Sequence, residues 1–113
     1  MHEMSIAQSL IDIVEEEMQK NNAKVLRSVR LNIGQMSAIV PDSLSFCFEI
    51  ITKGTPLDGA RLIMDLIPLM GYCNACEKEF EIEDYAFSCP KCGDTKIETT
   101  AGQDLSIVEI EVD

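Results

Sequence analysis

Two cysteine pairs, Cys73/Cys76 and Cys89/Cys92, constrain this sequence more than any other feature. Two residues separate the cysteines within each pair, and twelve residues separate the pairs. A turn of this length holds two sulfurs about as far apart as two corners of a tetrahedron around Zn(II), and two such turns complete a shell with Zn–S distances of about 2.3 Å. The spacing therefore predicts one closed, structural zinc site with no open position for catalysis.

The same four ligands leave other interpretations open. Four thiolates also bind a single iron or an iron-sulfur cluster, so the ligands alone do not separate zinc from iron. The cysteines could instead form two disulfides or remain core thiols, although the paired spacing favours one metal site. Pro90 inside the second pair and Gly93 directly after it supply the stiffness and the backbone freedom that a metal-binding turn needs.

The pattern of apolar residues predicts two amphipathic helices. Residues 5–21 place apolar side chains at steps of three and four, and Ser5 forms a capping-box pattern with the glutamine three residues later. A helix that begins at Ser5 leaves His2 and Glu3 outside it. Pro41, whose fixed φ suits a first helical turn, opens the second helix.

Three segments predict β-strands. Residues 27–33 alternate apolar and polar side chains, as a strand with one buried face does. Residues 60–67 are apolar on both faces, which predicts a central strand. Residues 105–112 alternate with a slip of phase near Ile107, which indicates a bulge or two-sided burial. Because the cysteine module interrupts the second and third strands, we expect these two strands to pair.

These elements predict an α+β fold, with two helices on one face of a small three-stranded sheet and an inserted zinc-ribbon module. The base domain should occupy residues 1–70 and 99–113, and the four-cysteine zinc-binding module residues 71–98. The 113 residues suffice for one ordinary domain with an insertion. A module of about 25 residues cannot fold on hydrophobic burial alone, so its metal must supply most of its stability.

The net charge of −11 bears on what the chain binds. Four thiolates and one Zn(II) bring this charge to about −13, which repels phosphate backbones. Between Tyr72 and Glu98 there are seven acids and three lysines, whereas zinc ribbons that bind nucleic acid need clustered lysine and arginine. The acidic run at residues 77–84 fits a solvated strand face or a docking surface for a basic partner. Nucleic acid is therefore not an expected partner.

The sequence also bears on location and class. It contains no apparent membrane span, and no basic segment followed by a long apolar run that would indicate a secretory signal. Four cysteines committed to a metal suit a reducing compartment. We therefore expect a cytoplasmic protein that binds no membrane. Its oligomeric state does not follow from the sequence, and we expect a monomer or weak dimer. The closed cysteine shell, without a nucleophile and base constellation, predicts that it is not an enzyme.

His2, the one histidine of the chain, is either a solvated residue or part of an exchangeable metal site. With Met1 as the first residue, its amine, the deprotonated amide of His2 and the His2 imidazole can chelate one ion through fused five- and six-membered rings. Nitrogen donors in a plane suit Ni(II) and Cu(II). The fourth donor then comes from the amide or carboxylate of Glu3, or from elsewhere. Such a site is accessible and exchangeable, as a metal carrier requires.

Several motifs together resemble the HypA/HybF family of nickel metallochaperones, and this resemblance covers essentially the whole chain. They are Met1-His2-Glu3, the helix start Ser5-Ile6-Ala7-Gln8-Ser9-Leu10, Ile33-Gly34, Lys53-Gly54-Thr55-Pro56-Leu57, Gly59-Ala60 and the two cysteine pairs. The cysteine pairs alone are not specific to this family, but their combination with the first three residues is.

The resemblance implies delivery of Ni(II) during maturation of nickel-iron hydrogenase, and in some bacteria also of urease. It implies that His2 is the essential nickel ligand beside the Met1 amine and Glu3, that nickel is exchangeable cargo, and that the four cysteines hold structural zinc. It also implies two partners, a HypB-type GTPase and the hydrogenase large subunit. Two alternatives are an acidic zinc-ribbon adaptor that binds a protein partner without transferring metal, and a rubredoxin-type electron carrier that binds iron.

Overall fold

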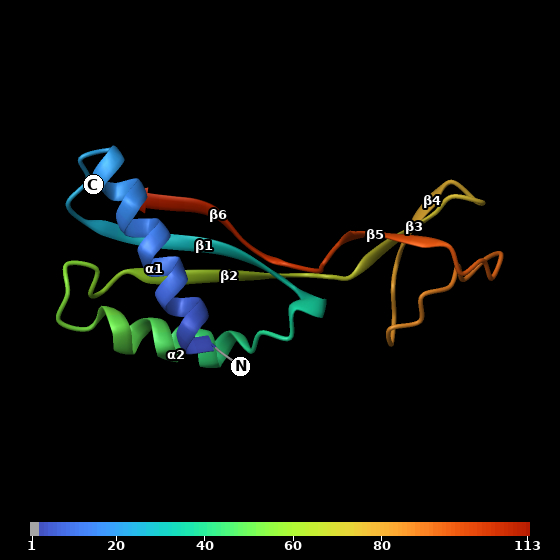
Figure 1. Cartoon of the computed structure of the whole chain (residues 1–113), viewed down its shortest axis with the longest axis horizontal. Helices are drawn as coiled ribbons and strands as arrows, with labels where there is room; N and C mark the ends of the chain where they lie inside the picture. Colours follow the sequence, from blue (N-terminus) through green and yellow to red (C-terminus); the bar gives the residue numbers. More distant parts are fainter. Residues whose placement is uncertain (1–2) are drawn as a thin grey trace. The chain divides into compact units, whose positions relative to one another are not determined.

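The structure is a computed structural model that describes residues 3–113, and Figure 1 traces its helices and strands. In chain order the elements are α1 (Glu3–Lys20), β1 (Leu26–Gly34), the 3-10 helix η1 (Gln35–Ser37), α2 (Pro41–Thr52), β2 (Arg61–Ile67), β3 (Met70–Cys73), β4 (Lys78–Glu81), β5 (Ile97–Ala101) and β6 (Leu105–Val112). Neither α1 nor α2 is a candidate membrane span. Two helices and two small sheets confirm the predicted α+β class.

The described chain divides into two compact units. The first, called the base unit, contains the segment up to Asn32, Ile39–Asp65 and Ser106–Asp113. The second, called the cysteine unit, contains Ile33–Ala38 and Leu66–Leu105. The domain limits predicted from the sequence describe segments that fold independently. That independent folding stays a prediction.

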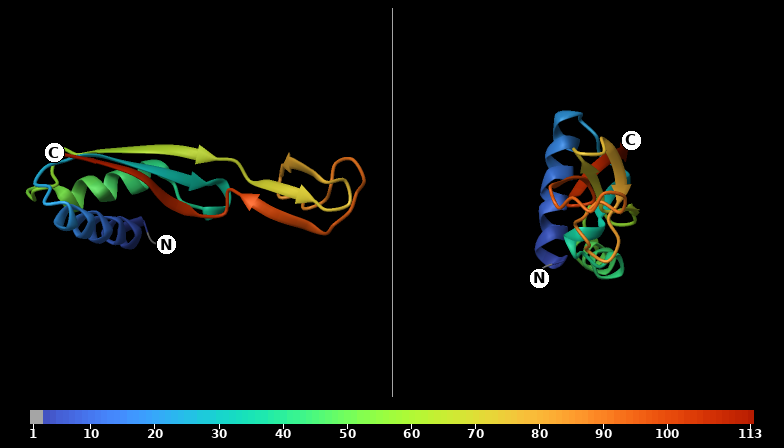
Figure 2. Two further views of the ribbon diagram at one scale, coloured as in Figure 1. Left: turned by 90° about the horizontal axis from the view of Figure 1, so that it is seen from above. Right: turned by 90° about the vertical axis from the view of Figure 1, so that its right-hand side faces the viewer.

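The base unit contains a three-stranded sheet with both helices on one face. The strand order is β2-β1-β6, and the view from above in Figure 2 shows α1 and α2 on the same side of this sheet. In β1, Val29 and Leu31 are fully buried. Each helix turns an apolar face inward, with buried side chains at Ala7, Leu10, Ile11, Val14, Met18, Leu44 and Phe48. The helical spacing of these residues is what the sequence predicts.

The predicted pairing of the strands that flank the cysteine module is wrong. β1 lies between β2 and β6, so β1 is the central strand and β2 lies at an edge. Most β1 side chains are buried, whereas none of the β2 side chains is fully buried. The apolar outer side chains of β2 therefore reflect an exposed sheet face, and they do not mark a central position. The chain that enters and leaves the module pairs within it instead, as β3 with β5.

Helix α1 begins earlier than its capping-box pattern predicts. Glu3 lies in the helix, so the expectation that the helix starts at Ser5 and excludes Glu3 is wrong. Glutamate and methionine are strong helix formers, and an acid in the first turn interacts favourably with the helix dipole. The other end of α1, at Lys20, is within one residue of the predicted end at residue 21. Directly after it, Asn22 adopts a left-handed φ of 53°, and the Ala23 N–H donates to the Met18 carbonyl at 2.9 Å.

The cysteine unit contains a second three-stranded sheet with the order β4-β3-β5. Both neighbours of β3 are antiparallel to it, and Cys73 pairs with Lys78 on one side and Ile97 on the other. Gly71 is buried in β3, where an added Cβ would lie 2.6 Å from the Ile97 side chain and 3.0 Å from that of Ile82. β4 lies within the acidic run at residues 77–84, for which a solvated strand face is one of the two interpretations, and its charged residues are exposed. β3 and β5, of four and five residues, are not among the predicted strands.

Gly102 provides a test of backbone packing in the cysteine unit. Its φ is +90°, and an added Cβ would lie 2.5 Å from both the Leu69 Cα and the Pro68 carbonyl oxygen. Gly54 has a similar φ of +77° but open space around it. We expect Gly102→Ala to lower the free energy of unfolding by about 1–3 kcal/mol more than Gly54→Ala, since only the former adds a clash. Chemical denaturation of both variants measures the difference, and equal losses would contradict this close approach.

Candidate metal centre

The four predicted cysteine ligands converge at one end of the cysteine unit. Their sulfurs all lie within 4.8 Å of one another. The Cys73 and Cys92 sulfurs are 3.7 Å apart, and those of Cys76 and Cys89 are 3.8 Å apart. A tetrahedron with Zn–S bonds of about 2.3 Å has edges of about 3.8 Å. Two sulfur pairs therefore have the separation that one tetrahedral ion requires, and all four sulfurs lie close enough together to share one ion.

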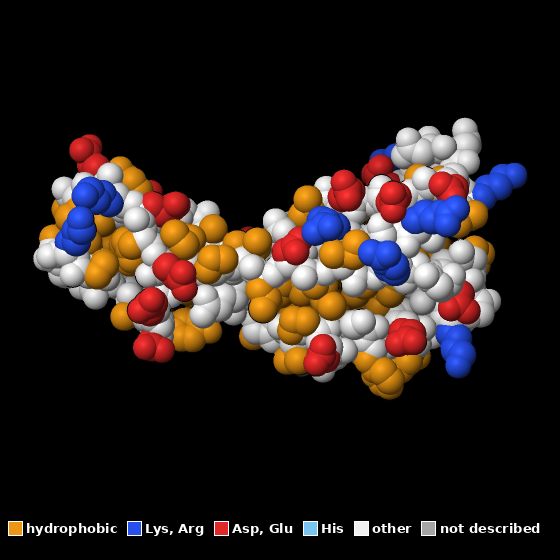
Figure 3. Space-filling view, turned by 180° about the vertical axis from the view of Figure 1, so that it is seen from behind, with side chains coloured by type: hydrophobic (Ala, Val, Ile, Leu, Met, Phe, Trp, Pro, Cys, Tyr) orange, Lys and Arg blue, Asp and Glu red, His pale blue; other side chains and the backbone are white. Residues whose placement is uncertain are grey.

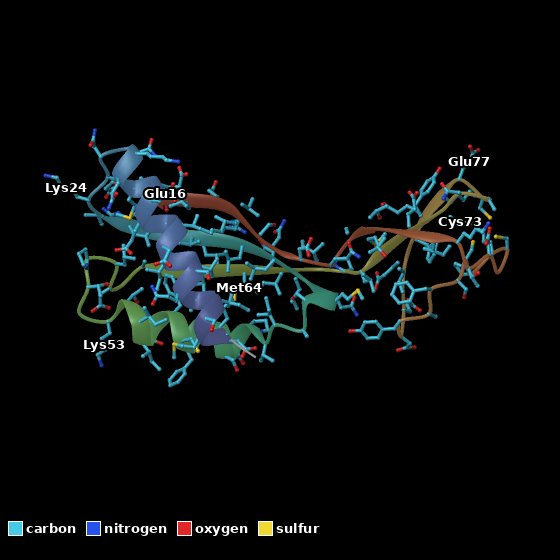
Figure 4. All side chains as sticks on the ribbon, in the orientation of Figure 1. Glu16, Lys24, Lys53, Met64, Cys73 and Glu77 are labelled. Atoms are coloured by element: carbon cyan, nitrogen blue, oxygen red, sulfur yellow. The ribbon has the colours of Figure 1, made fainter. Side chains whose placement is uncertain are left out.

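Each cysteine pair sits in the same kind of turn. After the first pair, the Glu77 N–H donates to the Cys73 carbonyl at 2.7 Å, and Glu77 has a φ of 55°. After the second pair, the Gly93 N–H donates to the Cys89 carbonyl at 2.9 Å, and Gly93 has a φ of 76°. Figure 4 labels Cys73 and Glu77 at the first turn. The two turns thus present their sulfurs in equivalent ways.

Gly93 could be identified from the sequence, but the role of Glu77 could not. A left-handed conformation is easy for glycine and uncommon for other residues. The one sequence signal that could have identified the role of Glu77 is its position, because Glu77 follows the first cysteine pair as Gly93 follows the second. The second turn has further support, since the Cys89 N–H donates to the Asp94 carbonyl and the Asp94 carboxylate accepts from the Lys96 N–H.

The thiols of the cluster differ in acidity. Hydrogen bonds from the backbone N–H groups of Cys92 and Lys91 lower the pKa of the Cys89 thiol to about 6. Hydrogen bonds with the sulfurs of Cys92 and Cys89 raise the pKa of the Cys76 thiol to about 12. Because of these hydrogen bonds, the Cys89 thiol loses its proton at a lower pH than the Cys76 thiol. A divalent ion allows all four to be deprotonated together.

The cluster is closed rather than catalytic. Cys73 is fully buried and Cys89 nearly so, whereas Cys92 is exposed at the tip of its turn. With four sulfur ligands in place, a tetrahedral ion has no free position for water or substrate. Cys47, the fifth cysteine, is half-buried on α2 and does not belong to the cluster.

The predicted nickel ligands fall mostly outside the described residues. Met1 and His2 precede the described range, so their placement stays a prediction. Glu3 is the first residue of α1 and is half-buried. The first four backbone N–H groups of a helix have no acceptor within the helix. The Glu3 amide is therefore not committed to the helical hydrogen-bond ladder.

Comparison with known proteins gives a consistent result over the full length. A family model described as "Hydrogenase/urease nickel incorporation, metallochaperone, hypA" matches residues 1–112. Among curated proteins, a hydrogenase maturation factor HypA from Geobacter metallireducens is 42% identical and one from Methylocella silvestris 36% identical, each over 113 residues and the whole of both chains.

Solved structures agree with the curated relatives. The solution structure of the Ni metallochaperone HypA from Helicobacter pylori has a TM-score of 0.70 at 25% identity, and the match covers 99% of this chain and 97% of that one. A second solution structure of a HypA protein has a TM-score of 0.69 at 26% identity, with 99% and 96% of the chains covered.

Proposed function

Because the chain belongs to the HypA family of nickel metallochaperones for hydrogenase maturation, we propose that it carries Ni(II) at its amino terminus and holds a resident zinc ion at its four cysteines. The assignment of nickel and zinc to two separate sites rests on the closed shell of four sulfurs. A closed shell retains its ion, whereas cargo that must be released needs a more exposed site. Two sites with different chemistry suit the two tasks.

The residues of the cysteine cluster fit zinc. Cys73, Cys76, Cys89 and Cys92 supply four soft donors within 4.8 Å of one another, and two of the sulfur pairs have the edge length that tetrahedral Zn(II) requires. Zinc has no redox chemistry and, in this shell, no catalytic position, so its contribution is to stabilise the fold of the cysteine unit. The protein then acts as a carrier rather than as an enzyme.

Nickel is the cargo of the amino-terminal site. The Met1 amine and the amide and imidazole of His2 supply three nitrogen donors in fused chelate rings, which suit square-planar Ni(II). Glu3 supplies the fourth donor through its amide or its carboxylate. The position of Glu3 supports this, because an N–H in the first turn of α1 is not used by the helix.

The partners of this function follow from the family. A HypB-type GTPase and the hydrogenase large subunit are the proposed partners, and urease maturation is a further use that the family description includes. We place the carrier in the cytoplasm, where a reducing environment keeps the zinc-binding thiols free of disulfides. It works as a monomer or weak dimer.

An extra residue before Met1 tests the amino-terminal site. One added glycine converts the Met1 amine to an amide and moves the free terminus out of the chelate, while His2 is unchanged. We expect nickel affinity to fall at least roughly tenfold, about 1.4 kcal/mol. Isothermal titration with Ni(II) measures this, and a variant with glycine added after Asp113 is the control. Unchanged affinity in the amino-terminal variant would remove the Met1 amine from the ligand set.

A further inference from the structure

One edge of the base-unit sheet has backbone groups available for another strand. β6 ends the order β2-β1-β6, so one of its sides has no neighbouring strand among the described residues. On the other side, Asp113 donates to the Val25 carbonyl at 2.9 Å and accepts from the Val25 N–H at 3.4 Å. Along an antiparallel strand, the backbone N–H and C=O groups of successive residues point to alternate sides. Those of Asp113 point toward β1, so those of Val112 and Ile110 point toward the free edge.

A groove runs along the free edge of β6. Its wall is the last part of α1, and its floor is β6 itself; the lining residues are Glu17, Met18, Asn21, Ile107, Val108, Glu109, Ile110 and Val112. Val108 is 54% exposed, and Ile107 and Ile110 are half-buried. An edge with exposed apolar side chains and unpaired backbone groups favours addition of a strand.

The charged residues that line this groove are acidic, although Lys20 lies 3.7 Å from Glu17. Glu17 and Glu109 line it, and no lysine or arginine is among its described lining residues. Glu111, two residues after Glu109, is exposed on the same strand. Figure 3 shows the sheet face that the helices leave open, where acidic side chains lie among lysine and arginine side chains. A strand placed beside β6 would meet carboxylates on one face and apolar side chains on the other.

We propose that the β6 edge binds an extended segment of a partner protein in which apolar residues alternate with lysine or arginine. Main-chain hydrogen bonds to the free edge provide affinity, and alternate side chains provide specificity. The basic residues lie opposite Glu109 and Glu111, and the apolar residues face Met18 and Ile110. This docking role uses neither metal site and goes beyond nickel transfer.

A second copy of this chain is the less favourable occupant. When two β6 strands pair antiparallel, the registers with most overlap place Glu109 of one copy opposite or diagonal to Glu109 of the other. Like charges at such positions destabilise a strand pair. A basic segment turns the same glutamates into favourable cross-strand partners.

The test uses two end-capped eight-residue peptides with the full-length, zinc-loaded protein. One peptide alternates valine with lysine, and the other alternates valine with glutamate. We expect the lysine peptide to bind saturably and to slow backbone hydrogen exchange in residues 105–112 but not in 61–67. No saturable binding, protection at β2 instead, or equal binding of the glutamate peptide would overturn the proposal without bearing on the nickel site.

A charge reversal sharpens the test. Glu109→Lys/Glu111→Lys should weaken binding of the lysine peptide about tenfold and allow the glutamate peptide to bind. Glu15→Lys/Glu49→Lys changes exposed helical residues by the same total charge and should leave both affinities within about twofold. Equal weakening by the two double variants would show attraction to the net charge rather than docking at β6. If the edge variant does not fold, the two peptides with the unaltered protein still decide the outcome.

Discussion

Replacing Cys73 with serine is expected to remove nearly all zinc and to unfold the cysteine unit while the base unit stays folded. Cys73 is fully buried on the central strand of the second sheet. Structural zinc contributes about 10–16 kcal/mol of binding free energy in small zinc-finger peptides, which is free energy of folding. Short strands of four or five residues cannot replace that contribution.

The measurements are zinc content after gel filtration and backbone amide NMR spectra. Resonances of Ile97 and Tyr72 should collapse toward random-coil positions, whereas those of Val29 and Leu44 should remain dispersed. Cys47→Ser is the matched control, because Cys47 is half-buried but lies outside the cluster. Full zinc retention in Cys73→Ser, or loss of the whole fold, would contradict the assignment of the metal to this unit alone.

Replacing His2 with alanine is expected to weaken nickel binding at least a hundredfold, about 2.7 kcal/mol. The variant loses the imidazole and the six-membered chelate ring, and no other histidine can substitute because the chain has one. Zinc content and thermal stability should stay close to those of the unaltered protein, because the proposed zinc ligands are all cysteines far along the chain.

Gln8→Ala is the control for His2→Ala, since Gln8 is an exposed residue of α1 that donates a hydrogen bond to Asp12. Both variants are titrated with Ni(II), and their zinc is quantified separately. Loss of zinc together with nickel in His2→Ala would show that the two sites are not separate. Unchanged nickel affinity would remove His2 from the ligand set.

The sequence predicted what depends on local spacing. The cysteine cluster follows from two short turns, and the buried faces of α1 and β1 follow from their periods. The end of α1 near residue 21 is likewise a local effect, because asparagine at position 22 tolerates a left-handed φ.

The errors concern choices between non-local arrangements. The apolar outer face of β2 indicated a central strand, but strand order depends on which strand buries the most surface, and that strand is β1. The start of α1 differed because a capping-box pattern at Ser5 competes with good helix formers before it. Glu77 was missed because its left-handed φ is imposed by the cysteine turn rather than by its own preference.

The metal content of the full-length protein, before and after titration with Ni(II), tests the division into two sites most directly. The account predicts about one zinc and no iron per chain as purified, and then about one nickel that binds without releasing zinc. The nickel-loaded protein should lack the strong absorption of thiolate-bound nickel, because the proposed nickel ligands are nitrogen or oxygen atoms and include no sulfur. Release of zinc in step with nickel uptake would place nickel at the cysteines and contradict the account.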